Sequence, residues 1–279
     1  WLAKKSGWFA AGIVDFDVLD GLNEFLSASQ KLALRSAVDL ETRAYIPELS
    51  DVDISSPGEP GVTYIMGCGF TSIPHAESSA GKTLAKLRQG AQDRNLALIA
   101  RINEALPEIA INYEKDVTPL TPKGVATERH IVRAYRVRST EVFNDNSQLA
   151  AFWAPLLKCT EDEFSAINAD VPKFEDLIRN ALAKRGGIGY IQPTPDTFPQ
   201  ATDFVQWVKD CNAIPTIAWL DGTSGGEADA DELLDRMTGM GCAALNIIPD
   251  RNWNIKDADT AALKQKKLDE VVNAAVKRN

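Results

Sequence analysis

The chain has 279 residues, of which 44% are hydrophobic and 25% are charged, a composition typical of a folded globular protein and not of a disordered one. This length is sufficient for one large α/β domain that carries an insertion. The formal net charge of -9 argues against nucleic acid and anionic membranes as partners, because no basic patch in the sequence opposes it.

The cysteines and the chain start give the first expectations about cellular context. The four cysteines are far apart, and none forms the C-x-x-C pair of a zinc or redox site. We expect free buried thiols, which indicate a reducing compartment and hence a cytoplasmic protein. No apolar run reaches the ~18 residues of a membrane span, and no signal-peptide pattern is present. Because the first residue is Trp1 and not Met, we expect a fragment or a processed form from which parts of a site are missing.

Short apolar runs alternate with longer amphipathic segments, as in strands followed by covering helices. The segment "FAAGIV" (9–14) predicts a strand, and "LDGLNEFLSASQKLAL" (19–34) predicts the helix after it. We expect further strands at 36–41, 62–67, 188–193, 214–220 and 243–249, and further helices near 199–210, 229–238 and 257–277. Such repeated βα units indicate a parallel sheet or a barrel.

The segment 82–186 has a different character, because its periodicity is helical almost throughout and prolines punctuate it. It contains no convincing strand. We therefore predict an α/β domain formed by residues 1–81 and 187–279, with an inserted helical subdomain at 82–186.

Polar side chains gather where the predicted strands end. In parallel α/β folds the carboxyl ends of the strands form the working face. Here these ends carry Asp15 and Asp17, Glu41 with Arg43, Gln192, Asp221, and Asn246 followed by Asp250 and Arg251. Neighbouring carboxylates repel one another unless a cation or a proton separates them, so the group suits divalent cations or acid–base chemistry. For Asp17 alone, capping of the following helix is an equally good interpretation.

The order of these segments resembles a known family. The stretch "AAGIVDFDVLDGLNEFLSASQKLALRSAVDLE" looks like consecutive motifs of the polymerase and histidinol phosphatase (PHP) family of metal-dependent phosphoesterases, in which a strand ends Thr-Asp-His-Asp and the next ends Gly-x-Glu. Asp15, Asp17 and Glu41 match the acidic positions of those motifs. The segments 62–70, 126–135, 214–222 and 243–252 resemble further family segments in the same order, so the resemblance spans most of the chain.

The resemblance implies a distorted (β/α) TIM-like barrel with an inserted helical subdomain, and a hydrolase of phosphate esters that uses divalent metal ions such as Mn, Zn, Fe or Mg. Its partner would be a small phosphorylated molecule. Under this reading the catalytic residues are Asp15, Asp17 and Glu41, the metal ligands are Asp15, Glu41 and Asn246, and the substrate-binding residues are Arg43, Arg129, His130 and Arg251. For Arg129 and His130, on a helix expected to begin near Thr127, a solvated helical face is the alternative.

Several positions depart from the family pattern. Phe16, Tyr64 and Trp219 stand where the family has histidines, and the only histidines are His75 and His130. The His-x-His and Asp-x-His motifs would lie outside residues 1–279. A second hypothesis is therefore a degenerate PHP-like protein, without metal, that serves as a binding or structural protein.

A third hypothesis is nucleotide binding by "AESSAGKT" (76–83), which fits a relaxed phosphate-binding loop ending in Lys82. The segment before it, "FTSIPH", contains a proline and is not an apolar strand, which disfavours this hypothesis.

Overall fold

The computed structural model describes residues 1–278 and divides the chain into two compact units. The first unit comprises Trp1–Leu87 and Pro193–Asn279, and the second comprises Arg88–Gln192.

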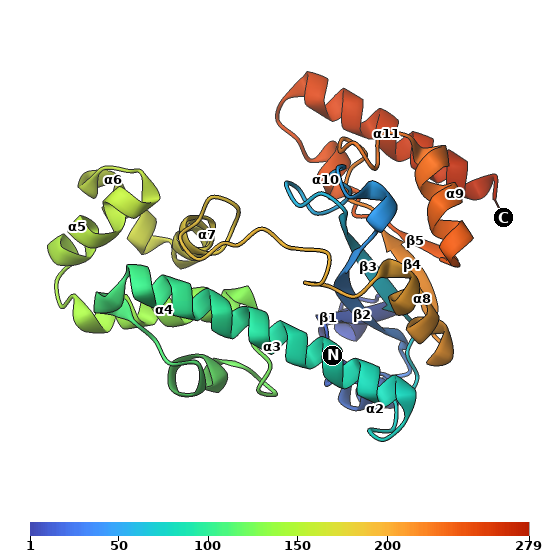
Figure 1. The fold of residues 1–279 in the computed structure, drawn as a ribbon, viewed down its shortest axis with the longest axis horizontal. Helices are drawn as coiled ribbons and strands as arrows, with labels where there is room; N and C mark the ends of the chain where they lie inside the picture. The colour runs from blue at the N-terminus through green and yellow to red at the C-terminus, as the bar shows by residue number, and fades with distance from the viewer. Residues whose placement is uncertain (279) are drawn as a thin grey trace. The chain divides into compact units, whose positions relative to one another are not determined.

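The first unit is built on one five-stranded mixed sheet (Figure 1). Its strands are β1 (Ala10–Phe16), β2 (Arg35–Tyr45), β3 (Val62–Cys68), β4 (Ile214–Ala218) and β5 (Ala244–Asn246), in the spatial order β1-β2-β3-β4-β5. β1 runs parallel to β2 and β4 runs parallel to β5, whereas β3 runs antiparallel to both of its neighbours.

The sheet is open, so the expected TIM-like barrel is wrong. Between β2 and β3 the chain forms only the short 3₁₀ helix η1 (Pro47–Leu49), and β3 therefore returns antiparallel beside β2. A closed barrel of βα units needs parallel neighbours joined by helical crossovers. In addition, the segment 188–193, expected to be a strand, forms turns and irregular structure. The sheet consequently has two edges, β1 and β5.

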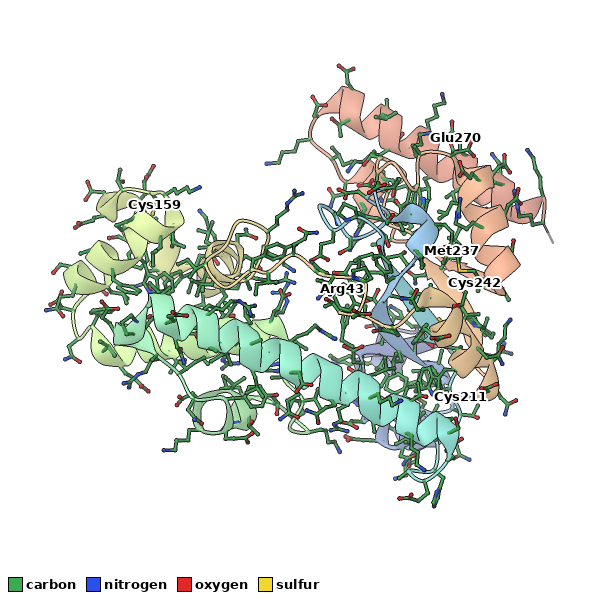
Figure 2. All side chains as sticks on the ribbon, viewed as in Figure 1. Arg43, Cys159, Cys211, Met237, Cys242 and Glu270 are labelled. Carbon is green, nitrogen blue, oxygen red and sulfur yellow. The ribbon has the colours of Figure 1, made fainter. Side chains whose placement is uncertain are left out.

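Helices cover one face of this sheet. The helices of the first unit are α1 (Leu2–Lys5), α2 (Leu22–Lys31), α8 (Ala201–Asp210), α9 (Ala230–Met240), α10 (Asp250–Trp253) and α11 (Ala258–Val276), with the start of α3 (Ser79–Ala105). Alternate residues of β2, among them Val38 and Leu40, are buried against apolar side chains of α2, α8, α9 and α11. Met237 and Cys242 belong to the same core (Figure 2).

The other face carries exposed apolar side chains. Val14 and Ile214 are each 51% exposed, and Phe16 is 40% exposed. The strand register places all three on the face that also carries Glu41, because Phe16 pairs with Glu41 and side chains alternate along each strand. This surface, formed by Val14, Phe16, Glu41 and Ile214, is called the open face below.

The second unit is helical. It contains the rest of α3, the short helical turns η2 (Pro107–Ile109), η3 (Tyr113–Val117) and η4 (Thr118–Leu120), and the helices α4 (Glu128–Val142), α5 (Asn146–Leu157), α6 (Glu161–Ala169) and α7 (Val171–Leu182). Aromatic residues, including Tyr135, Trp153 and Phe174, fill its core. No helix within residues 1–278 is long and apolar enough to cross a membrane.

The four cysteines are free thiols, as expected. Cys242 is buried, whereas Cys68, Cys159 and Cys211 are partly exposed. The expectation of burial is therefore confirmed for one of the four.

Candidate functional site

Asp17 lies just beyond the end of β1 and turns its carboxylate toward β2. Its φ of 59° is in the left-handed region, which Asp tolerates better than most residues. Two contacts hold this conformation: the Asp17 amide donates to the Glu41 carbonyl at 3.0 Å, and the Thr42 hydroxyl donates to Asp17 Oδ1 at 2.5 Å. The N-cap of α2 is Gly21, so the capping interpretation of Asp17 is wrong.

Asp15 and Glu41 lie on opposite faces of the sheet. In the parallel pairing of β1 with β2, Asp15 stands opposite Leu40, and Phe16 stands opposite Glu41. Asp15 therefore shares the helix-covered face with Leu40, and a Cβ placed on Gly21 would lie 3.3 Å from Asp15 Oδ2. Burial, followed by the charge of Asp20, raises the pKa of Asp15.

Glu41 lies on the open face within electrostatic reach of Asp17 and Arg251. Burial raises the pKa of Glu41, the Arg251 guanidinium opposes this shift, and Asp17 adds to it. Arg251 comes from α10, which follows β5, and its side chain is exposed. Beside Glu41, the ring of Phe16 meets that of Tyr64 edge to face, with 5.9 Å between the ring centroids. The structure thus brings together Asp17, Glu41 and Arg251, next to an aromatic pair.

Arg43 is two residues beyond Glu41 on the same face, but its guanidinium is engaged within the protein. It pairs with Glu59 at 2.9 Å and lies over the ring of Phe198, 4.3 Å from the centroid. Glu59 also accepts a hydrogen bond from Ser56 at 2.6 Å. Arg43 therefore ties the connection after β2 to the segment before α8.

Asn246 lies across the sheet from Glu41. β5 is three strand positions from β2, which corresponds to about 14 Å at the usual strand spacing. This separation does not bring Asn246 and Glu41 to one metal ion.

Arg129 and His130 belong to the second unit, where both have local partners. Arg129 pairs with Asp176 at 3.3 Å, and both side chains are exposed. Thr127 is the N-cap of α4, and its backbone N–H donates to His130 Nδ1 at 3.0 Å. Burial, with the nearby charge of Arg133, lowers the pKa of His130. These contacts explain both residues as parts of a helix start, and their substrate-binding role stays a prediction.

The loop 76–83 forms the start of α3. The Gly81 amide donates to the Ser78 hydroxyl, and the Lys82 amide donates to the Ser78 carbonyl. A Cβ on Gly81 would lie 2.1 Å from the His75 carbonyl oxygen, so this glycine is needed for packing. Because Ser78 satisfies these N–H groups, the loop geometry is that of a helix cap and not of a phosphate cradle.

A second polar centre lies at the end of β4, where the sequence indicates Asp221 but not Glu227. Glu227 is only 2% exposed and accepts hydrogen bonds from the amides of Leu220, Asp221 and Gly222. Asp221 pairs with Lys264 at 2.7 Å. The sequence signal for this centre is the glycine-rich segment "DGTSGGE" (221–227), which closely follows a buried strand.

The described residues do not fit a divalent metal site. No group of three His, Cys, Asp or Glu residues that could hold a metal ion occurs within residues 1–278. The pairing of β1 with β2 explains why no such group forms near Glu41. It turns Asp15 to the opposite face of the sheet and puts Phe16 next to Glu41.

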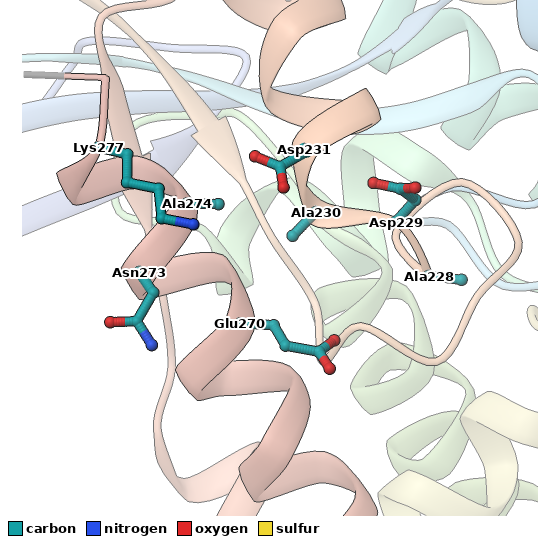
Figure 3. Close-up of a pocket in the computed structure, with 8 residues that line it drawn as sticks. All are labelled: Ala228, Asp229, Ala230, Asp231, Glu270, Asn273, Ala274 and Lys277. Carbon is teal, nitrogen blue, oxygen red and sulfur yellow. The ribbon is translucent and has the colours of Figure 1, made fainter.

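A cavity of about 400 Å³ lies between the start of α9 and the second half of α11 (Figure 3). Its acidic side chains are paired within the protein, since Asp231 contacts Arg278 at 2.7 Å and Glu270 contacts Lys267 at 2.9 Å. We assign no role to this cavity.

Comparison with known proteins shows a likeness of fold only. No protein-family model matches the chain, and no curated protein matches it significantly. A crystal structure of a putative metal-dependent phosphoesterase from Bifidobacterium adolescentis superposes with a TM-score of 0.59 at 18% identity, covering 98% of this chain and 76% of that one. An amidohydrolase from Chromobacterium violaceum, with bound sulfate and no metal, gives a TM-score of 0.57 at 14% identity, covering 96% and 75%. The chain thus shares the fold of these two structures.

Proposed function

We propose that this protein uses the phosphoesterase-like fold to bind a small phosphorylated molecule where β1 ends beside Glu41 of β2, without metal-centred hydrolysis. The observation that carries the proposal is the register of β1 on β2, which puts Phe16 beside Glu41 and turns Asp15 to the opposite face. An aromatic ring thus stands where a further ligand would be needed to complete a metal site.

The side chains near Glu41 offer complementary contacts to such a molecule. Arg251 is an exposed cation that suits a phosphate group. The Glu41 carboxylate is an acceptor for a ligand hydroxyl group. The Phe16–Tyr64 pair supplies an apolar surface beside them. A phosphate ester that also carries hydroxyl groups combines these features.

The second candidate is hydrolysis of phosphate esters with divalent metal ions, which the likeness of fold favours. Glu41 would serve it from the open face, with the Asp17 carboxylate within electrostatic reach. The two candidates share a ligand class and differ in metal content and turnover.

Metal analysis and ligand binding separate them. We expect the purified protein to contain less than one equivalent of Mn, Zn, Fe or Mg, and to leave p-nitrophenyl phosphate intact when these metals are added. Calorimetric binding of a panel of hydroxylated phosphate esters should identify a ligand that Arg251→Ala weakens at least tenfold. Arg185→Ala, which removes an exposed charge in the second unit, serves as the control.

Stoichiometric metal together with phosphatase activity that Glu41→Ala abolishes would establish the hydrolase instead. Binding that is indifferent to both Arg251 and Glu41 would contradict a site beside Glu41.

A further inference from the structure

Three successive backbone amides at the end of β4 converge on one buried carboxylate. Leu220 donates to Glu227 Oε1 at 2.7 Å, and Asp221 and Gly222 donate to Oε2 at 3.1 and 3.0 Å. The turn requires a φ of 81° at Gly222, a conformation that glycine adopts readily. A concave array of successive N–H groups of this kind is an anion-binding nest.

Backbone groups alone hold the Glu227 carboxylate. It forms no ion pair with any Lys or Arg among residues 1–278, and burial raises its pKa although the three amides lower it. Asp221, whose charge also acts on Glu227, is paired with Lys264 at 2.7 Å and accepts a hydrogen bond from the Thr223 hydroxyl at 2.6 Å. The nest therefore has the donors of an anion site, with the charge of Asp221 already compensated.

An independent observation shows unused hydrogen-bonding capacity at the same loop. Trp219 Nε1 and Ser224 Oγ are buried and have no partner within the described residues. Trp219 is 2% exposed, and its indole lies against Gly222. A Cβ added to Gly222 would be 2.9 Å from Trp219 Cζ2, an atom two bonds away from Nε1. The indole edge that carries the free donor is thus packed against the nest. One carboxylate offers fewer acceptor sites than a tetrahedral oxyanion, which could use these donors as well.

Asn252 adds an acceptor beside the same loop. It is fully buried, and its Nδ2 donates to the carbonyls of Lys264 at 2.7 Å and Asp221 at 3.3 Å. Its Oδ1 has no partner in residues 1–278. A protonated phosphate oxygen or a ligand hydroxyl is the type of donor that this atom could accept.

We propose that the nest formed by Leu220, Asp221 and Gly222 is a binding site for a phosphate group, and that Glu227 occupies it as an internal ligand. Gly225 and Gly226 precede Glu227 and border a cavity of about 170 Å³. For the carboxylate to leave when a phosphate group replaces it, this segment has to shift and release the hydrogen bond from the Gly226 amide to the Asp53 carbonyl at 2.8 Å. This site uses none of the residues of the proposed site near Glu41, so a test of the nest does not depend on the proposed function.

The test compares Glu227→Ala with Glu232→Ala. Both variants remove one negative charge from the same segment, but Glu232 is an exposed residue of α9 that pairs with Arg236. Calorimetric titration with inorganic phosphate at constant ionic strength should show binding at least tenfold tighter in Glu227→Ala than in Glu232→Ala or the unmodified protein. Acetate should compete, and Trp219→Phe in the Glu227→Ala background should weaken phosphate binding severalfold.

Equal phosphate affinity in Glu227→Ala and Glu232→Ala would overturn the proposal. If Glu227→Ala does not fold in chloride buffer, the same protein is refolded in phosphate or acetate. Recovery of the folded state by either anion supports the nest as an anion site, and failure of both anions to restore it overturns the proposal.

Discussion

Two regions of the sheet each hold two acidic side chains, but their surroundings differ: the end of β1 beside Glu41 of β2, and the end of β4. At β4, Glu227 accepts three backbone amides, and Asp221 is bound by Lys264 and Thr223. At β2, no group within residues 1–278 donates a hydrogen bond to the Glu41 carboxylate, whose pKa burial raises. Only the charge of Arg251 opposes that shift.

This difference separates a centre that an internal carboxylate already fills from a site that is open to a ligand. At β4, an outside anion has to displace the buried Glu227 carboxylate before the three amides can bind it. At β2, the Glu41 carboxylate lies on the open face beside the 40% exposed Phe16 and keeps its hydrogen-bonding capacity. Buried polar groups normally have hydrogen-bond partners, and exceptions occur most often at functional positions. The partly buried Glu41 carboxylate is such an exception. The predictions below test this contrast.

Lys264→Met should produce the largest effect. It leaves the Asp221 carboxylate without its cation and should lower the free energy of unfolding by about 2–3 kcal/mol, measured by urea denaturation at pH 7. Burial raises the pKa of Asp221, but hydrogen bonds from Lys264 and Thr223 outweigh it and hold the pKa below 3.8. The stabilisation is therefore present above pH 3.8 and is lost as the pH falls through the folded-state pKa.

Lys266→Met is the matched control for Lys264→Met. The Lys266 side chain is 74% exposed, and its ion pair with Glu270 is long, at 3.7 Å. It should change stability much less. Equal losses in the two lysine variants would contradict a stabilising centre at the end of β4.

Thr42→Val should produce the second largest effect. It removes the hydroxyl that donates to Asp17 Oδ1, while Asp17 stays 4% exposed and in the left-handed conformation. We expect a loss of about 1–2 kcal/mol in thermal or urea unfolding. Thr216→Val is the control, since this buried hydroxyl donates to the neutral Ile214 carbonyl and its removal should cost less. A smaller loss at Thr42 than at Thr216 would show that Asp17 does not depend on this contact.

Local patterns in the sequence predicted the elements of the first unit but not how its sheet is arranged. All five strands begin within a residue or two of a predicted strand, because apolar residues mark them clearly. The direction of β3 depends on the connection 46–61, and nothing in the apolar pattern shows that this connection lacks a covering helix. The segment 188–193 looked like a strand, but Gly189 packs so closely on Leu98 and Ile102 that a Cβ there would lie 2.6 Å from Ile102 Cγ1.

For the candidate site, too, the sequence predicted which residues are involved but not how their side chains are arranged. The motifs placed Asp15, Asp17 and Glu41 at the ends of adjacent strands. In the structure Asp15 and Asp17 lie at the end of β1, whereas Glu41 lies within β2, which continues to Tyr45. The face on which each side chain lies depends on the register, where a shift of one residue reverses the outcome. The role of Glu227 depends on the positive φ of Gly222, a property of the folded turn that a single sequence does not reveal.

Glu41→Gln should have a smaller effect of the opposite sign. Because burial raises the pKa of Glu41 above 4.5, the folded state favours its protonated form, and ionisation costs stability as the pH rises from 4.5 through the folded-state pKa. The variant should therefore gain about 0.5–1 kcal/mol at neutral pH, and the gain should disappear below pH 4.5. Denaturation at several pH values measures it. Glu48→Gln removes the same charge from an exposed turn and should show no such pH-dependent gain.

Phe16→His should change stability least, within about 0.5 kcal/mol, because the ring is already 40% exposed. The substitution tests whether the aromatic residue alone keeps metal away from Glu41. We expect no stoichiometric zinc or manganese after dialysis, measured by elemental analysis, because Asp15 faces the other side of the sheet and the Asp17 carboxylate accepts from Thr42. Val14→His is the control, because Val14 lies two residues before Phe16 on the same face of the sheet. One tightly bound metal ion in Phe16→His but not in Val14→His would contradict this expectation. It would mean that the Phe16 side chain alone, and not the register of the sheet, prevents metal binding beside Glu41.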